Sequence, residues 1–172
     1  MKKLLMSAVA LMMAMSVNAQ SFLNDSETPF SEGKFYVGAS FSGLEAKYSK
    51  ANDWSLGLQA KAGYLFLDNW MLVGVFDYEN RSNGSNISVN IGAGARYYFD
   101  KVGIYAGATA KYSHDKVSGI NGYDDFKPEA YVGYAFFVSK HVTIEPELYY
   151  EHSFHDTDYS GFGLRVGFGY FF

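Results

Sequence analysis

The stretch that decides the fold is GFGLRVGFGYFF, residues 161–172. Its residues alternate strictly between two classes, and this period of two predicts an extended strand with two distinct faces. One face is large and apolar, and it comprises Phe162, Leu164, Val166, Phe168, Tyr170 and Phe172. The other face is mostly small, and it comprises Gly161, Gly163, Arg165, Gly167, Gly169 and Phe171. Because glycine weakens a strand interior and fills no core, this second face needs a special environment.

Seven more segments with the same alternation precede this one, at residues 34–44, 54–66, 70–79, 86–99, 102–113, 125–138 and 142–154. In the segment 70–79 both faces are apolar, so the pattern leaves its inward face open. The connections after the second, fourth and sixth segments are tight, whereas the other four are longer and polar. No helical period appears. The sequence therefore predicts an all-β protein, an eight-stranded antiparallel up-and-down barrel.

Such a barrel could be soluble, with its apolar face inside, or could span a membrane, with its apolar face toward lipid. The glycine-rich face carries too few charges for a water-exposed surface, but it suits a narrow lumen that must admit long side chains. Aromatic residues also gather near both strand ends, with Tyr64 and Tyr97 at the tight-turn end and Trp54, Tyr112 and Tyr150 at the other. Two aromatic belts are typical of a bilayer interface. We therefore expect a transmembrane barrel.

The first residues of the chain predict export from the cytoplasm. Lys2 and Lys3 precede an apolar run that ends in VNA, which is the pattern of a signal peptide over residues 1–19. Residues 20–33 are polar and lack a period, so we expect a loose periplasmic linker before a barrel domain at 34–172. The chain of 172 residues has a net charge of −4, which gives no basic footprint for nucleic acid. It has no cysteine, which excludes disulfides and thiol catalysis.

Residues 34–172 resemble the small eight-stranded outer-membrane barrels of the OmpA/OmpX type. The ending VGFGYFF resembles the C-terminal signal that the barrel-assembly machinery recognises, which would assign this role to Phe168, Tyr170 and Phe172. The resemblance implies an outer-membrane location with long loops external and both termini periplasmic. It also implies outer-membrane lipid, lipopolysaccharide and the assembly machinery as partners.

A barrel of eight strands leaves an interior just wide enough for side chains, so inward charges must be paired. We expect an ion-pair network that plugs the lumen, formed by Lys61, Arg96, Lys111, Glu129, Glu145, Glu147, Glu151 and Arg165. If residues 155–159 close the last hairpin, Arg165 lies opposite Tyr149, within diagonal reach of Glu147 and Glu151. The alternative is a narrow ion path through the lumen. Pro146 lies in the middle of a paired strand, where we expect a bulge.

The long connections carry the candidate contact residues, which are Tyr123, Asp124, Asp125, Asp156 and Asp158. They could touch an extracellular ligand or be solvated caps. Some barrels of this architecture modify lipid A with a His, a Ser and a Glu, but the adjacent His152 and Ser153 must point to opposite faces. The stretch from Asp156 has glycine where a calcium loop needs its bidentate glutamate. We therefore predict no metal, no cofactor and no catalytic residue, and a non-enzymatic structural or adhesive role; the alternatives are a lipid-modifying enzyme and a small-solute pore.

Overall fold

The computed structural model describes residues 28–41, 55–81, 86–99, 103–117, 123–155 and 160–172. These residues form antiparallel strands, and no helix among them is both long and apolar enough to cross a bilayer. The strands are β1 (Phe35–Phe41), β2 (Ser55–Leu67), β3 (Trp70–Arg81), β4 (Asn86–Phe99), β5 (Ile104–Val117), β6 (Tyr123–Tyr134), β7 (Phe136–Phe137), β8 (Val142–Glu151) and β9 (Gly161–Phe171). The expected signal peptide lies outside the described residues.

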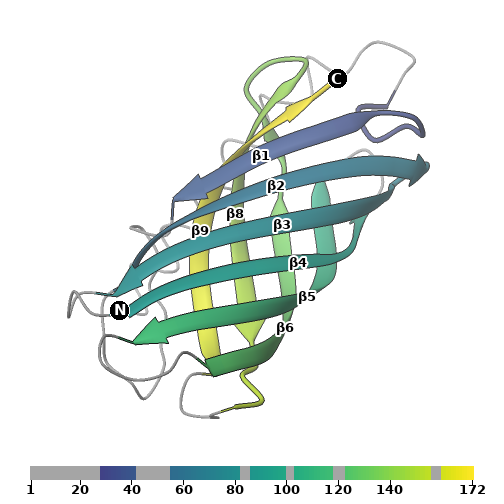
Figure 1. The fold of residues 1–172 in the computed structure, drawn as a ribbon. Coiled ribbons are helices and arrows are strands. Elements are labelled where there is room, and N and C mark those ends of the chain that lie inside the picture. The colour runs from purple at the N-terminus through teal and green to yellow at the C-terminus, as the bar shows by residue number, and fades with distance from the viewer. Residues whose placement is uncertain (1–27, 42–54, 82–85, 100–102, 118–122, 156–159) are drawn as a thin grey trace.

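Each strand from β1 to β5 pairs with the next, β6 and β7 both pair with β8, β8 pairs with β9, and β9 pairs with β1, so the sheet closes on itself (Figure 1). The closing seam aligns Ala39 with Phe168 and Tyr36 with Phe171. Strands β6 and β7 are two parts of one barrel strand, because both pair with β8 in the same register on either side of Ala135. The barrel therefore has eight strands, and the predicted fold class is confirmed.

Alternation assigns the two faces of every strand, as the glycine-rich ending predicts. The exposed face carries large apolar side chains, and the inward face carries the buried polar and charged ones. The structure also decides the segment that the sequence left open. Met71, Val73, Val75 and Asp77 of β3 are buried, whereas Leu72 and Phe76 are about half exposed. One side of the lumen is therefore lined with apolar side chains.

The inward glycines make room for inward tyrosines on the neighbouring strand. Tyr131 of β6 lies opposite Gly107 of β5, and a Cβ added to that glycine would be 2.5 Å from the tyrosine hydroxyl. Tyr105 covers Gly133 in the same way. Tyr149 of β8 covers Gly163 of β9, so this arrangement recurs around the barrel. The glycine-rich inward face therefore provides the space that the tyrosine rings occupy.

Two local expectations about the strands are wrong. The register of β8 with β9 runs without a shift past Pro146, so no bulge forms there. The β6–β8 ladder instead stops at Gly133 and resumes in β7 at Phe136, and between them the Ala135 N–H donates to the Gly103 carbonyl oxygen over 2.8 Å. The third long connection is also shorter than expected, because β5 extends to Val117 and β6 begins at Tyr123.

Residues 28–34, which we call the N-terminal strap, pack against the barrel rather than forming a loose linker. Phe30 is fully buried, and the Asn69 N–H donates to its carbonyl oxygen over 2.8 Å. Asn69 has a positive φ of 66° in the tight turn between β2 and β3. The strap therefore occupies the tight-turn end of the barrel. Alternation could not reveal this contact, because the strap has no strand period.

Candidate functional site

The candidate site is the charged lumen. Its side chains form layers along the barrel, and strand β8 passes these layers one after another. From the tight-turn end, its inward side chains are Thr143, Glu145, Glu147, Tyr149 and Glu151. Two more carboxylates come from other strands, Asp77 of β3 and Glu129 of β6. The cations that meet them come from β2, β4, β5 and β9, and they are Lys61, Arg96, Lys111 and Arg165. The structure thus brings together all eight residues of the expected lumen network.

The first layer is centred on Glu145. Arg96 Nη1 donates to Glu145 Oε2 over 3.0 Å, and the Tyr36 hydroxyl donates to the same oxygen over 2.9 Å. The Thr143 hydroxyl donates to the other carboxylate oxygen over 2.8 Å. A carboxylate with three donors is well compensated for the loss of water, so burial in the lumen is tolerable here.

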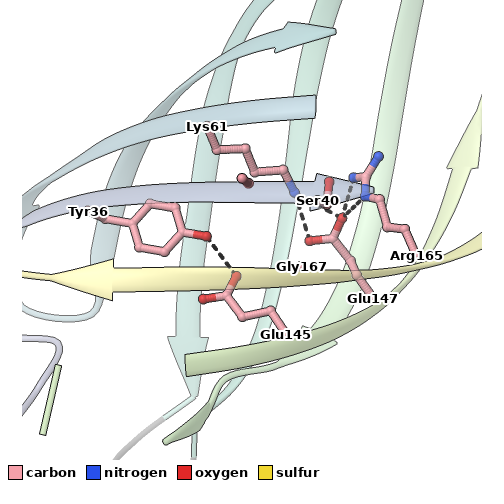
Figure 2. A pocket seen from close by; sticks show the side chains of 8 residues that line it. Tyr36, Ser40, Lys61, Glu145, Glu147, Arg165 and Gly167 are labelled. Atoms are coloured by element: carbon pink, nitrogen blue, oxygen red, sulfur yellow. Dashed lines mark hydrogen bonds and ion pairs between the residues drawn. The ribbon is translucent and has the colours of Figure 1, made fainter. Parts of the chain in front are cut away.

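The second layer is centred on Glu147. Lys61 Nζ lies 3.1 Å from both carboxylate oxygens, and Arg165 binds the same carboxylate from the facing strand (Figure 2). The Tyr105 hydroxyl adds a hydrogen bond of 3.1 Å. A small cavity beside Ser40, with room for about one water molecule, borders this layer. Side chains therefore fill the cross-section almost completely at this level.

The third layer joins the other charges through Glu129. Arg165 is bidentate on this carboxylate, with contacts of 2.9 and 2.6 Å. Lys111 Nζ lies 2.9 Å from Glu129 and also contacts Asp77 at 3.4 Å and Glu151 at 2.5 Å. Because Arg165 binds both Glu129 and Glu147, it links the second and third layers. A single connected network spans the middle of the barrel.

The expected partner register of Arg165 is wrong by two residues. Arg165 lies directly opposite Glu147, and Tyr149 lies opposite Gly163. The ladder ends at Glu151 and Gly161, so β8 ends three residues before the expected boundary at residue 154. Glu147 is therefore a direct rather than a diagonal partner of Arg165, and Glu151 binds Lys111 instead.

Sequence reasoning missed the tyrosines of the lumen. The Arg96 guanidinium carbon lies 4.1 Å from the centroid of the Tyr105 ring, and that of Arg165 lies 4.5 Å from the Tyr149 ring. The Lys61 ammonium lies 5.1 Å from the Tyr131 ring. These cation–π contacts strengthen a desolvated network. Their signal in the sequence was a tyrosine on the polar face of five segments, at Tyr36, Tyr98, Tyr105, Tyr131 and Tyr149, but only the register shows which cation each ring meets.

The candidate contact residues near the long connections do not form one cluster. Asp125 is buried, and it accepts hydrogen bonds from the Ser153 hydroxyl over 2.6 Å and the His155 N–H over 3.0 Å. This interior position is a correction, because strand pairing continues past the expected loop boundary. Asp124 is exposed and lies 2.8 Å from His114 across the β5–β6 hairpin. Tyr123 begins β6, its side chain is outside the described part, and Asp156 and Asp158 lie outside the described residues.

His152 and Ser153 separate as the sequence predicts. His152 Nδ1 lies 3.1 Å from the Ser160 hydroxyl, whereas Ser153 turns inward to Asp125. The described residues show no carboxylate hydrogen-bonded to the His152 ring and hold no cluster of metal-ligating side chains. The His, Ser and Glu constellation of the alternative, a lipid-modifying enzyme, does not assemble among the described residues.

The three residues of the expected assembly signal point outward, Phe168 and Tyr170 within β9 and Phe172 directly after it. Phe168, Tyr170 and Phe172 are 51%, 44% and 59% exposed, respectively. Phe172 also closes the seam, because its backbone exchanges two hydrogen bonds with Phe35. An exposed aromatic strand end is available to an assembly partner, and this role stays a prediction.

Comparisons with known proteins agree on the architecture. A family model described as the type IX secretion system membrane protein PorP/SprF matches residues 17–171. The N-terminal barrel domain of OprF from Pseudomonas aeruginosa is similar, with a TM-score of 0.62 and 13% identity over 82% of this chain and 98% of that one. Neisserial surface protein A has a TM-score of 0.61 and 15% identity, over 80% and 95% of the two chains. Ail from Yersinia pestis has a TM-score of 0.57 and 16% identity, over 82% and 100%.

At these identities the similarity is one of fold, which confirms the small outer-membrane barrel architecture. No curated protein sequence matches the chain.

Proposed function

The chain belongs to the PorP/SprF family of type IX secretion system membrane proteins, and we propose that it serves that system as a closed, non-enzymatic barrel of the outer membrane. The resemblance to OmpA/OmpX-type barrels holds for the fold, whereas PorP/SprF is the family. The observation that carries the proposal is the lumen. Its ion pairs and aromatic rings occupy the space through which a solute would pass.

A closed barrel must act through the surfaces that it exposes. We propose that the long connections face outside the cell, that both termini are periplasmic and that residues 1–19 direct export. The exposed end of the β5–β6 hairpin, with His114 and Asp124, offers a polar contact surface. Ail has been solved in complex with a heparin analogue, sucrose octasulfate, and by analogy we propose ligand contact through this end of the barrel. Lipid, lipopolysaccharide and the assembly machinery would be the other partners.

The experiment that tests the secretion role compares a deletion strain with complemented strains. We expect deletion to reduce the type IX cargo proteins in the culture medium, measured by mass spectrometry, and the wild-type chain to restore them. The double variant His114→Ala, Asp124→Ala should restore them poorly, because it removes the exposed hairpin contacts. Lys140→Ala, at the opposite end of the barrel, is the matched control. Normal cargo release without the gene would reject this role.

Two measurements on the same strains separate the alternatives. Steady single-channel conductance of the purified protein in a planar bilayer would show that the barrel is a pore and reject the closed barrel. A change in the lipid A mass spectrum on deletion, reversed by the wild-type chain, would show that the protein is a lipid-modifying enzyme. We expect neither, because the lumen is filled and the described residues assemble no catalytic constellation.

A further inference from the structure

The N-terminal strap is tied to the barrel at several points. The Gly33 N–H donates to the Leu65 carbonyl oxygen over 2.8 Å, and the Leu65 N–H donates to the Lys34 carbonyl oxygen over 2.9 Å. The Glu32 N–H donates to the Asp68 carboxylate over 2.8 Å. These bonds fix the strap to the end of β2 and to the following turn. The strap is therefore an integral part of the tight-turn end of the barrel.

Phe30 is the residue of the strap whose side chain packs inside the barrel. Its ring stacks on Tyr98 of β4, with centroids 4.0 Å apart and an interplanar angle of 12°. It also contacts Phe137 of β7 and Phe171 of β9, each with centroids 5.7 Å apart. Because these partners come from strands on different sides of the barrel, Phe30 closes the apolar cross-section between them.

The aromatic layer lies directly below the first ionic layer. The Tyr98 hydroxyl accepts a hydrogen bond of 3.1 Å from Arg96 Nη1, and the same nitrogen binds Glu145. Tyr36 connects the layers in a second place, because its ring packs on Phe171 and its hydroxyl binds Glu145. The two layers use different chemistry, apolar packing in one and charge pairing in the other.

We propose that the strap is a resident plug, and that the lumen has two independent seals in series at its tight-turn end. The aromatic seal is Phe30 with its three ring partners, and the ionic seal is the Glu145 and Glu147 layers. Either seal alone blocks passage, since barriers in series must all be open for a solute to pass. The proposal does not depend on the role in type IX secretion.

The test uses single reporter cysteines, because the chain has none of its own. Leu65→Cys places a thiol beside the strap, where Leu65 is fully buried. Ser40→Cys places a thiol at the small cavity that Glu145 and Glu147 line, where Ser40 is 5% exposed. Each reporter is combined with Phe30→Ala, with the pair Arg96→Ala and Glu145→Ala, and with all three changes. The full mature chain is folded in detergent and treated with a small charged methanethiosulfonate reagent, and labelling is followed by mass spectrometry.

We expect both thiols to be protected in the parent chain. Phe30→Ala should raise the labelling rate of Leu65→Cys at least tenfold while Ser40→Cys stays protected, and the triple change should expose Ser40→Cys. Phe30→Leu, which keeps an apolar side chain in place, and Phe35→Ala, on the outward face, should leave both thiols protected. Only samples with heat-modifiable migration are compared.

The proposal fails if Leu65→Cys reacts in the parent chain or stays protected with Phe30→Ala. It also fails if Phe30→Ala alone exposes Ser40→Cys, because the ionic layer would then not be a seal. Should the Arg96 and Glu145 variants not fold, these comparisons with Phe30→Ala still decide the matter.

Discussion

At the scale of single residues, Arg165 shows what a barrel lumen requires of a buried charge. Its guanidinium binds the carboxylates of Glu129 and Glu147 and packs on the ring of Tyr149. All of these groups are buried, so each charge depends on its partners in place of water. Arg165 is therefore a structural residue in the interior of the network.

Arg165→Leu should lower the free energy of unfolding by about 3–5 kcal/mol, because it leaves two buried carboxylates without their shared cation. Urea unfolding of the protein in lipid vesicles, followed by tryptophan fluorescence, measures the change. The double variant Arg165→Leu, Glu147→Gln should be less destabilised, since it also removes one of the stranded charges. An unchanged midpoint for Arg165→Leu would refute the network.

At the scale of strands, the glycines and tyrosines form an interlocking pattern. Three inward tyrosines each lie over a glycine of the adjacent strand, Tyr131 over Gly107, Tyr105 over Gly133 and Tyr149 over Gly163. The ring covers the backbone of its neighbour, and the Tyr105 hydroxyl also donates to Glu147 over 3.1 Å. Glycine is required at these positions for space, because the added Cβ would meet the ring or the backbone.

Gly107→Ala should destabilise the barrel by about 1–3 kcal/mol, the usual cost of overpacking. Gly74→Ala is the matched control, because its Cβ would point outward and meet only a carbonyl oxygen at 3.8 Å. Unfolding midpoints of the two variants in the same vesicles provide the measurement. Equal effects would show that strand propensity, and not the tyrosine above Gly107, limits this position.

At the scale of the whole molecule, the protein has the opposite arrangement to a soluble barrel, with apolar side chains outside and charged side chains inside. Its outward face has an aromatic belt near each end, with small aliphatic residues between them. One belt comprises Phe35, Tyr64, Trp70, Phe99, Tyr170 and Phe172, and the other comprises Tyr78, Tyr112, Phe126, Tyr150 and Phe162. The interior carries the charges. This inversion matches a lipid solvent.

Ala108→Lys, in the middle of the outward face of β5, should destabilise the membrane-inserted barrel by about 2–4 kcal/mol. Val138→Lys, beside the tight turn after β7, should cost only about 0–1 kcal/mol, because the interface solvates its charge. The readout is unfolding in vesicles of matched thickness. If both substitutions were neutral, the outward face would not be in contact with lipid.

Much of this architecture follows from the sequence alone. Clear alternation in seven of the eight segments indicates the barrel and assigns Arg96, Glu145 and Arg165 to its interior. Alternation suffices because successive side chains of a strand point to opposite faces, whatever the partner strand is. The glycine-rich face of residues 161–172 likewise indicated a crowded lumen before any neighbour was known.

Only the tertiary structure decided what depends on register and on contacts across the lumen. A register two residues from the expected one places Arg165 opposite Glu147, and the extension of β6 places Asp125 in the interior. The alternation pattern also could not predict which face of β3 points inward or where Phe30 packs. Alternation assigns a side chain to a face but not to a height or a partner, and a segment without a period carries no information on its contacts. These quantities are set by closure of the barrel, which joins strands far apart in sequence.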